Sequence, residues 1–197
     1  MRVYLEAGKT WTFACAVDWP GWCRRGKGEE TAIDTLLAYA DRYAPAAGSG
    51  FDVGEVTVVG RTSGSPNTDF GALANPGAWD DEPISAAERE RQLAILERAW
   101  SCFDEVARTA PPELRKGPRG GGRDRDKVVD HVREAERAYA SKAGVRVPPR
   151  TPWPKQRATL LGALRDDSVE RKWPVRYAIR RITWHVLDHV WEIEDRS

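Results

Sequence analysis

The apolar residues in the second half of this 197-residue chain recur at spacings of three and four, and this pattern constrains the fold more than any other feature. From Ser85 onward, one such stripe is formed by Leu93, Leu96, Trp100, Phe103 and Val106. Residues at this spacing lie on one face of an α-helix, which can bury them together. Ser85, with Glu88 three residues later, also predicts a capping box at the start of the helix.

Three more helices are expected after the first. The helical patterns cover residues 126–144, residues 155–167 and a stretch that runs from Pro174 almost to the C-terminus. Proline and glycine interrupt the chain between them. The basic, glycine-rich stretch 111–125 is interpreted as a solvated loop rather than a nucleic-acid-binding arm. Four consecutive helices predict a four-helix bundle over residues 85–197.

The first 62 residues have a different periodicity. Apolar and polar residues alternate in Val3–Ala7 and in Thr10–Val17, as in half-buried strands, and Gly8-Lys9 between them predicts a hairpin turn. A helix is expected over residues 28–44 and a strand over residues 54–62. The expected order of elements is therefore β-β-α-β.

The fold class that follows is α+β. A small β-β-α-β domain (residues 1–62) precedes the helical bundle (residues 85–197). The intervening residues 63–84 are dense in Gly, Pro, Ser, Asn and Asp, which is typical of loops. Because long loops in compact proteins are commonly functional, this one is expected to be a linker or a lid.

A short motif in the first segment resembles the small HicB-like domain. A hairpin is followed by a D-x-P-G turn, a glycine and an acidic helix start, here Asp18, Pro20, Gly21, Gly26, Glu29, Glu30 and Ala32. HicB-like domains occur in antitoxins. The resemblance therefore implies either an interaction module or a structural remnant.

Composition excludes several classes of partner. Thirty-one Lys and Arg residues stand against 30 Asp and Glu, for a formal charge of +1, so no global positive field attracts nucleic acid or an anionic membrane. The N-terminal stretch has no long apolar segment, and a cytoplasmic protein with no membrane contact is expected. Cys15, Cys23 and Cys102 are odd in number and lack a framework spacing, so no disulfide is expected.

The three histidines all fall in the middle of expected helices. His185 and His189 are four residues apart, so both imidazoles project from one face of the last helix. His131 lies within the second helix and can face them across a bundle. The three are either metal ligands or core histidines held by hydrogen bonds, and the spacing by itself leaves both readings open.

These histidines carry a resemblance to the DinB superfamily, which includes YfiT-like metal-dependent hydrolases and thiol-dependent S-transferases. His131 is followed by x-x-x-A-E-x-x-Y, with Ala135, Glu136 and Tyr139, and the last helix carries H-x-x-x-H. The resemblance covers residues 85–197. It implies a four-helix bundle in which His131, His185 and His189 bind a divalent metal, zinc or alternatively nickel or iron.

The S-transferase branch implies that a low-molecular-weight thiol such as mycothiol attacks an electrophilic small molecule. The alternatives are a hydrolase that uses metal-bound water, a non-catalytic HicB-like or DinB-like binding or regulatory protein, and a bundle that keeps its metal without catalysis. A homodimer is compatible with all of these.

Several charged residues are candidates for supporting roles. Glu134 and Glu136 are candidates for a base or for a partner of a ligand, with helix-surface charge as the alternative. Arg180 and Arg181 are candidates for binding an anionic thiol or a carboxylate. Asp130 and Asp188, each next to a histidine, either orient an imidazole or face solvent.

Overall fold

The structure is a computed structural model that describes residues 1–117 and 121–197; the expected basic loop at 111–125 thus includes three residues, 118–120, that lie outside the described residues. In chain order the elements are β1 (Arg2–Ala7), β2 (Thr12–Ala16), β3 (Cys23–Gly26), α1 (Glu29–Ala38), α2 (Ala40–Ala47), β4 (Thr57–Ser63), α3 (Pro66–Phe70), the 3-10 helix η1 (Ala78–Asp80), α4 (Ala86–Thr109), α5 (Arg125–Lys142), α6 (Trp153–Arg165) and α7 (Val175–Arg196). The α+β class is confirmed.

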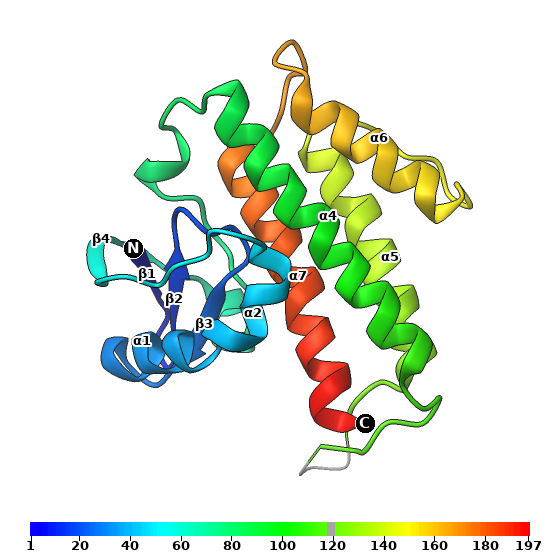
Figure 1. Ribbon diagram of the computed structural model, residues 1–197, viewed down its shortest axis with the longest axis horizontal. Helices are drawn as coiled ribbons and strands as arrows, with labels where there is room; N and C mark the ends of the chain where they lie inside the picture. Colours follow the sequence, from blue (N-terminus) through cyan, green and yellow to red (C-terminus); the bar gives the residue numbers. More distant parts are fainter. Residues whose placement is uncertain (118–120) are drawn as a thin grey trace.

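The four strands form one sheet in the order β3-β2-β1-β4. β1 and β2 pair in antiparallel fashion as the expected hairpin, β2 pairs in the same way with β3, and β4 adds in parallel to the other side of β1. A parallel neighbour requires a crossover connection, and α1 and α2 supply it. In Figure 1 the sheet lies to the left of the long helices, with α1 below it.

The expected β-β-α-β order is wrong in two details, because the segment runs β-β-β-α-α-β. β3 is a four-residue strand with two arginines, which gives no clear alternation, and only its pairing with β2 defines it. The single helix expected over residues 28–44 breaks at Tyr39 into α1 and α2. Beyond the break, Tyr43 stacks on the Trp22 ring and donates its hydroxyl to the Pro20 carbonyl oxygen.

Two glycines of the HicB-like motif allow close packing. Gly21 has φ 90°, and a Cβ atom there would lie 2.5 Å from the Thr183 Cγ2 atom of α7. A Cβ atom on Gly26 would lie 2.4 Å from the backbone nitrogen of Ala32. Both contacts are too short for any side chain, so glycine is required where the turn meets α7 and where β3 meets α1.

The segment of residues 63–84 contains α3 and η1, and three carboxylates fasten it. Asp69 accepts hydrogen bonds from three backbone N–H groups of the β1–β2 turn. Glu6, on β1, accepts from the Thr68 hydroxyl and from the backbone N–H of Ala74. Asp80 pairs with Arg180 of α7 at 2.6 Å. The segment is thus bonded to both the sheet and α7.

The four expected helices are confirmed as α4, α5, α6 and α7. In Figure 1, α4, α5 and α7 run beside one another and α6 lies near their upper end. Ser85 caps α4 by accepting a hydrogen bond from the Glu88 N–H. The reciprocal half of the expected capping box is not seen, because the Glu88 carboxylate binds Arg91 and Gln92 instead. No helix in the described ranges is both long and apolar enough to span a bilayer.

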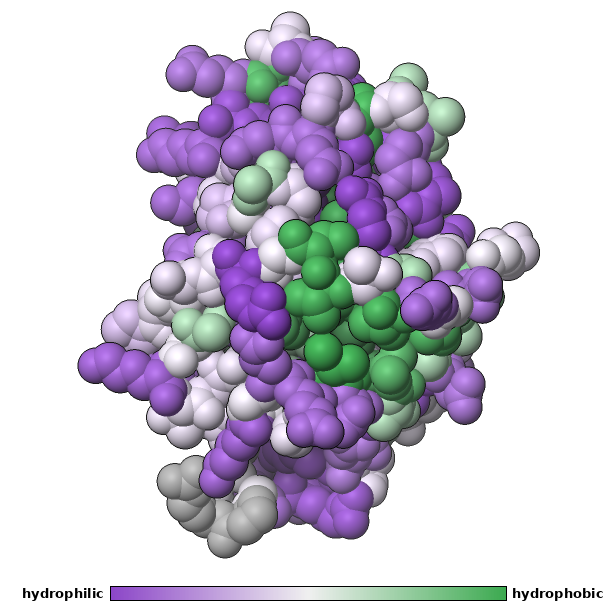
Figure 2. All heavy atoms as spheres, turned by 90° about the vertical axis from the view of Figure 1, so that its left-hand side faces the viewer, coloured by the Kyte–Doolittle hydropathy of each residue, from purple (hydrophilic) through white to green (hydrophobic). Residues whose placement is uncertain are grey.

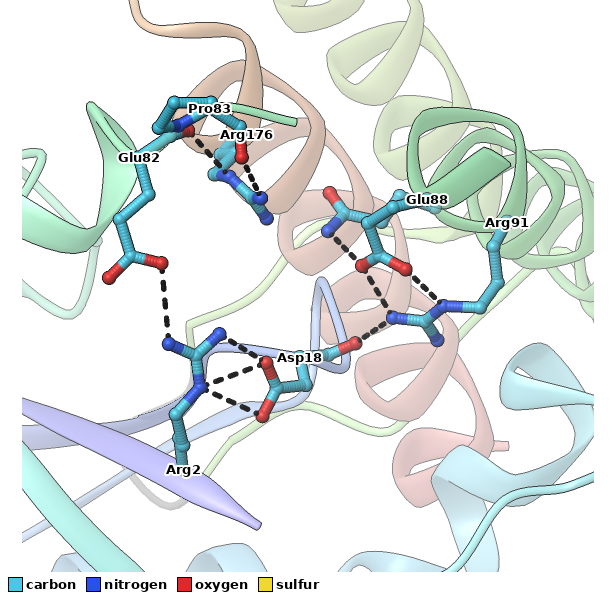
Figure 3. A network of polar contacts seen from close by, with 8 residues as sticks. Arg2, Asp18, Glu82, Pro83, Glu88, Arg91 and Arg176 are labelled. Atoms are coloured by element: carbon cyan, nitrogen blue, oxygen red, sulfur yellow. Dashed lines mark hydrogen bonds and ion pairs between the residues drawn. The ribbon is translucent and has the colours of Figure 1, made fainter. Parts of the chain in front are cut away.

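The sheet and the long helices share one hydrophobic core. Buried side chains of β1 and α1, such as Leu5 and Leu36, belong to the same cluster as Leu93 of α4 and Val186 of α7. A polar network closes the edge of this junction (Figure 3). There Arg2 pairs with Asp18, and the backbone carbonyl oxygen of Asp18 accepts a hydrogen bond from the Arg91 side chain of α4. The first segment is therefore packed firmly on the helices.

One face of the molecule is notably apolar. Figure 2 shows apolar side chains gathered on the side that lies at the left of Figure 1, where the outer strand β4 is found, while much of the surrounding surface is polar. Large apolar side chains that are exposed include Leu37 and Val59, at 36% and 42% of their surface.

Candidate metal centre

The three histidines converge on one point. α5 supplies His131, and α7 supplies His185 and His189 one helical turn apart. One coordinating atom from each of the three lies within 4.8 Å of the others. The Nε2 atom of His185 lies 3.2 Å from the Nε2 atom of His131. The sequence spacing therefore does bring the predicted ligands together.

The arrangement fits a divalent metal ion. Zinc–nitrogen bonds of about 2.0–2.1 Å place two ligand nitrogens of a tetrahedral ion about 3.3 Å apart, close to the 3.2 Å between the two Nε2 atoms. Two neutral imidazoles that point their lone pairs at each other repel unless a proton or a cation lies between them. Imidazole is a ligand of zinc, nickel and iron alike, so the donor set does not select among these metals.

Glu192 orients one of the three rings, and the sequence interpretation missed it. Its Oε2 atom lies 2.7 Å from Nδ1 of His189. A carboxylate that accepts the Nδ1 proton leaves the lone pair on Nε2 free for a metal. The hydrogen bond with His189 also lowers the pKa of Glu192. A glutamate three residues after a ligand histidine on the same helix was the available signal.

Burial favours the metal-binding, neutral form of two of the imidazoles, those of His185 and His131. His185 and His189 expose only 7% and 8% of their surface, whereas His131 is more open. Burial holds the pKa of His185 well below its ordinary value, and the positive charges of neighbouring groups, Arg181 among them, lower it further. Burial likewise lowers the pKa of His131, with Arg123 contributing. The neutral forms of His185 and His131 are therefore favoured near neutral pH.

Aromatic rings and one guanidinium border the centre. The ring of Tyr139, the tyrosine of the A-E-x-x-Y motif, packs edge-on against His185 with 5.4 Å between centroids. The Arg181 guanidinium lies over the rings of Tyr139 and Trp184, at 5.0 and 4.7 Å. Arg181 forms no ion pair with any carboxylate in residues 1–117 or 121–197. Its positive charge is thus available beside His185.

Arg180, the other arginine candidate, lies elsewhere. It is almost fully buried, donates to Asp80 at 2.6 Å and lies over the Tyr4 ring on the sheet. Asp188 also binds an arginine rather than a histidine, with 2.9 Å to Arg24. Both side chains connect α7 to the first segment of the chain.

The two glutamates of α5 have different surroundings. Glu134 is exposed and pairs with Arg137 on the same helix. Glu136 is fully buried and accepts a hydrogen bond from the Trp153 indole of α6 at 2.5 Å. Neither side chain has a hydrogen bond to any of the three histidines in the part of the chain that the structure describes.

Comparison with known proteins found no family model, no curated protein and no solved structure that matches this chain. The DinB-like and HicB-like resemblances therefore remain predictions from short motifs. The functional argument depends on the geometry of the three histidines and of the residues that surround them.

Proposed function

We propose that the protein is a metal-dependent enzyme with a DinB-like four-helix bundle, in which a low-molecular-weight thiol reacts with an electrophilic small molecule. His131, His185 and His189 are the ligands of zinc or a similar divalent ion. The observation that carries the proposal is the convergence of three imidazoles from two helices. One of these imidazoles, that of His189, is hydrogen-bonded to a carboxylate.

The ion would supply Lewis acidity, stabilising the deprotonated form of a thiol or of water at the coordination positions that three imidazoles leave open. The residues of the chain have separate roles. Glu192 fixes the tautomer of His189. Arg181, next to His185 and without a carboxylate partner in the described residues, favours a negatively charged reactant. The rings of Tyr139 and Trp184 exclude water from that side.

In the transfer, the thiol gives up its proton to solvent, a sulfur–carbon bond forms, and the leaving group departs from the electrophile with the electron pair of its bond. The Arg181 guanidinium, beside His185 and without a carboxylate partner in the described residues, is suited to this step, because the thiolate carries the negative charge that it attracts. The same surroundings would favour hydroxide, so hydrolysis is the main competing outcome of the tests.

The metal is tested first, on protein purified without an affinity tag. Elemental analysis is expected to find about one divalent ion per chain, and His185→Ala is expected to reduce this below about 0.2. Asp130→Asn is the matched control, because Asp130 is exposed and has no hydrogen bond to an imidazole in the described residues, so the change removes a charge beside His131 and leaves all three imidazoles in place. Metal-free wild-type protein that gains no thermal stability from added zinc would contradict the proposal.

The reaction is tested next with monobromobimane as electrophile and a panel of low-molecular-weight thiols. Zinc-loaded protein is expected to accelerate thioether formation with at least one thiol, and His185→Ala to abolish the acceleration. Consumption of monobromobimane without consumption of thiol would identify the hydrolase instead. Full metal occupancy with neither reaction would favour a metal-binding protein without catalysis.

A further inference from the structure

A cavity of about 360 Å³ lies between the sheet and the C-terminal half of α7. Five of its lining residues come from the first 71 residues of the chain, namely Phe13 on β2, Arg24 and Arg25 on β3, Phe70 on α3, and Gly71. Trp191 and Glu192 of α7 form the opposite wall. The part of the chain that precedes the long helices thus forms about half of the cavity wall.

The cavity adjoins the metal centre. Glu192 lines it and, through its Oε2 atom, binds Nδ1 of His189. A molecule in the cavity is therefore separated from His189, a predicted metal ligand, only by the carboxylate of Glu192. This proximity connects the first segment with the chemistry proposed for the three histidines.

The carboxylates that line the cavity are already paired. Asp188 binds Arg24 at 2.9 Å, and Asp195 binds Arg42 at 2.9 Å. Glu192 accepts a hydrogen bond from Arg196 at 2.6 Å in addition to its contact with His189. None of these three negative charges requires a cationic ligand.

Arg25 is the contrasting case. It forms no ion pair with a carboxylate in the described ranges, and its guanidinium lies over the Trp11 ring at 4.7 Å. A Cβ atom on Gly71 would lie 2.2 Å from the Arg25 Nη1 atom, so the guanidinium is set closely against the glycine that follows α3. Arg25 therefore adds to the wall a positive charge that no carboxylate of the described residues pairs with.

The cavity also has an apolar side. Phe70 is 88% exposed although it is a large aromatic residue, whereas Trp191, on the facing helix, exposes only 2% of its surface. An exposed phenylalanine at the rim of a cavity gains burial when an apolar group binds beside it. An unpaired guanidinium together with aromatic rings is the combination that recognises an organic anion with an apolar body.

We infer that this cavity binds a small organic carboxylate, with Arg25 contacting the charged group and the exposed Phe70 packing on the apolar part, next to the buried Trp191. Its assignment as a reactant of the metal centre depends on the proposed function, whereas binding itself does not. The β3–α3 wall is then the part of the molecule that selects the small molecule.

The test uses benzoate and its neutral isostere benzamide as probes. Each is titrated into ¹⁵N-labelled full-length protein while the indole N–H signal of Trp191, assigned with Trp191→Phe, is followed by NMR. Benzoate is expected to shift this signal saturably, and benzamide to bind at least about fivefold more weakly, because it lacks the charge. Arg25→Gln is expected to weaken benzoate by at least about fivefold and to leave benzamide unchanged.

Arg146→Gln is the matched control, since Arg146 is an exposed arginine beyond the C-terminal end of α5. Equal losses for Arg25→Gln and Arg146→Gln would mean that overall charge governs binding, and the inference would be wrong. Equal affinity for benzoate and benzamide, or an unshifted Trp191 signal, would also overturn it. The titration is repeated on His185→Ala, which should still bind benzoate, because binding does not depend on the metal. Wild-type protein that binds benzoate but no divalent ion would refute the proposed function alone.

Discussion

Two polar clusters are enclosed by the long helices, and they differ in how their charges are balanced. Around Glu136, a buried carboxylate faces the Arg157 guanidinium at 3.5 Å and the Trp153 indole at 2.5 Å. Around His185, three imidazoles lie together with the positive charge of Arg181 nearby, and Glu192 is the carboxylate bonded to one ring. In the first cluster the positive charge of Arg157 is balanced by Glu136 and by Asp104 at the surface, whereas the second has an excess of positive groups and lone pairs.

The contrast separates structure from function. A buried acid and base that face each other need nothing from outside the chain, and removing one of them leaves a buried charge. Three convergent imidazole nitrogens compete for protons until an electron-pair acceptor joins them. Glu136 is therefore assigned to stability, although it belongs to the same A-E-x-x-Y motif as Tyr139 beside His185.

The largest effect is expected from Glu136→Ala. Loss of the carboxylate leaves Arg157 inside the protein with Asp104 as its acidic partner at the surface, and the free energy of unfolding should fall by about 3 kcal/mol. Glu136→Gln keeps an acceptor for Trp153 and should cost about 1–2 kcal/mol. Urea unfolding gives the free energy of unfolding of both variants.

The same variants should still gain thermal stability from zinc to the same extent as the wild type. If Glu136→Gln folds but loses the response to zinc, the two clusters are not separate and Glu136 takes part in metal binding. That result would remove the distinction on which the comparison is based.

Glu192→Gln should weaken zinc binding and leave stability almost unchanged, the opposite of the Glu136 variants. Without the carboxylate, His189 loses the group that fixes its tautomer, and zinc affinity should fall by about 10- to 100-fold, while stability of the metal-free protein changes little. Glu194→Gln is the control on the same helix, because Glu194 binds Arg42 and forms no hydrogen bond or ion pair with a histidine in the described residues. Competition with a chromophoric zinc chelator gives both affinities.

An equal loss of affinity in the two variants would show that net charge, rather than orientation of His189, determines metal binding. A loss confined to Glu192→Gln would sharpen the contrast between a cluster that is complete and one that needs an ion.

Periodicity was sufficient to predict the long helices from the sequence, because apolar stripes such as that of α4 are local patterns. It failed at β3, whose four residues become a strand only through pairing with β2. It also failed at Tyr39, where α1 ends without a proline or glycine. Elements that depend on a distant partner have no signature in their own residues.

The same reasoning applies to the metal centre. The spacing of His185 and His189 is local, and it correctly predicted a shared face. Whether His131 faces them depends on how α5 packs on α7. The expectation that it does came from the motif resemblance. The pairing of Arg180 with Asp80 could not be predicted, since Asp80 is 100 residues earlier and lies in a segment that reads as loop.

A smaller effect is expected from the network at the junction of the sheet with α4 (Figure 3). The hydrogen bond with Arg2 lowers the pKa of Asp18 in the folded protein against the opposing effect of burial. A lowered folded pKa means that the pair stabilises the fold above the unfolded pKa of about 3.9 and ceases to do so as pH falls below it. Both side chains are roughly two-fifths exposed, so solvent screens the pair.

Asp18→Asn should therefore cost about 0.5–1 kcal/mol at pH 6, with the difference from wild type vanishing near pH 2–3. Urea unfolding at the two pH values measures it. A difference that persists at the lower pH would show that the asparagine disturbs the backbone contact with Arg91 rather than a charge pair.

Glu134→Gln should have the smallest effect, and it tests whether exposure, rather than position on α5, decides what a glutamate does. Glu134 and Glu136 are two residues apart, yet Glu134 faces solvent and pairs with Arg137 three positions along the same helix. Such a pair contributes a few tenths of a kcal/mol at most, so unfolding free energy, zinc affinity and thiol transfer should all stay at wild-type values. A rate that falls while stability and zinc affinity are unchanged would instead assign Glu134 a part in proton transfer, and the exposed surface of α5 beside His131 would then belong to the site.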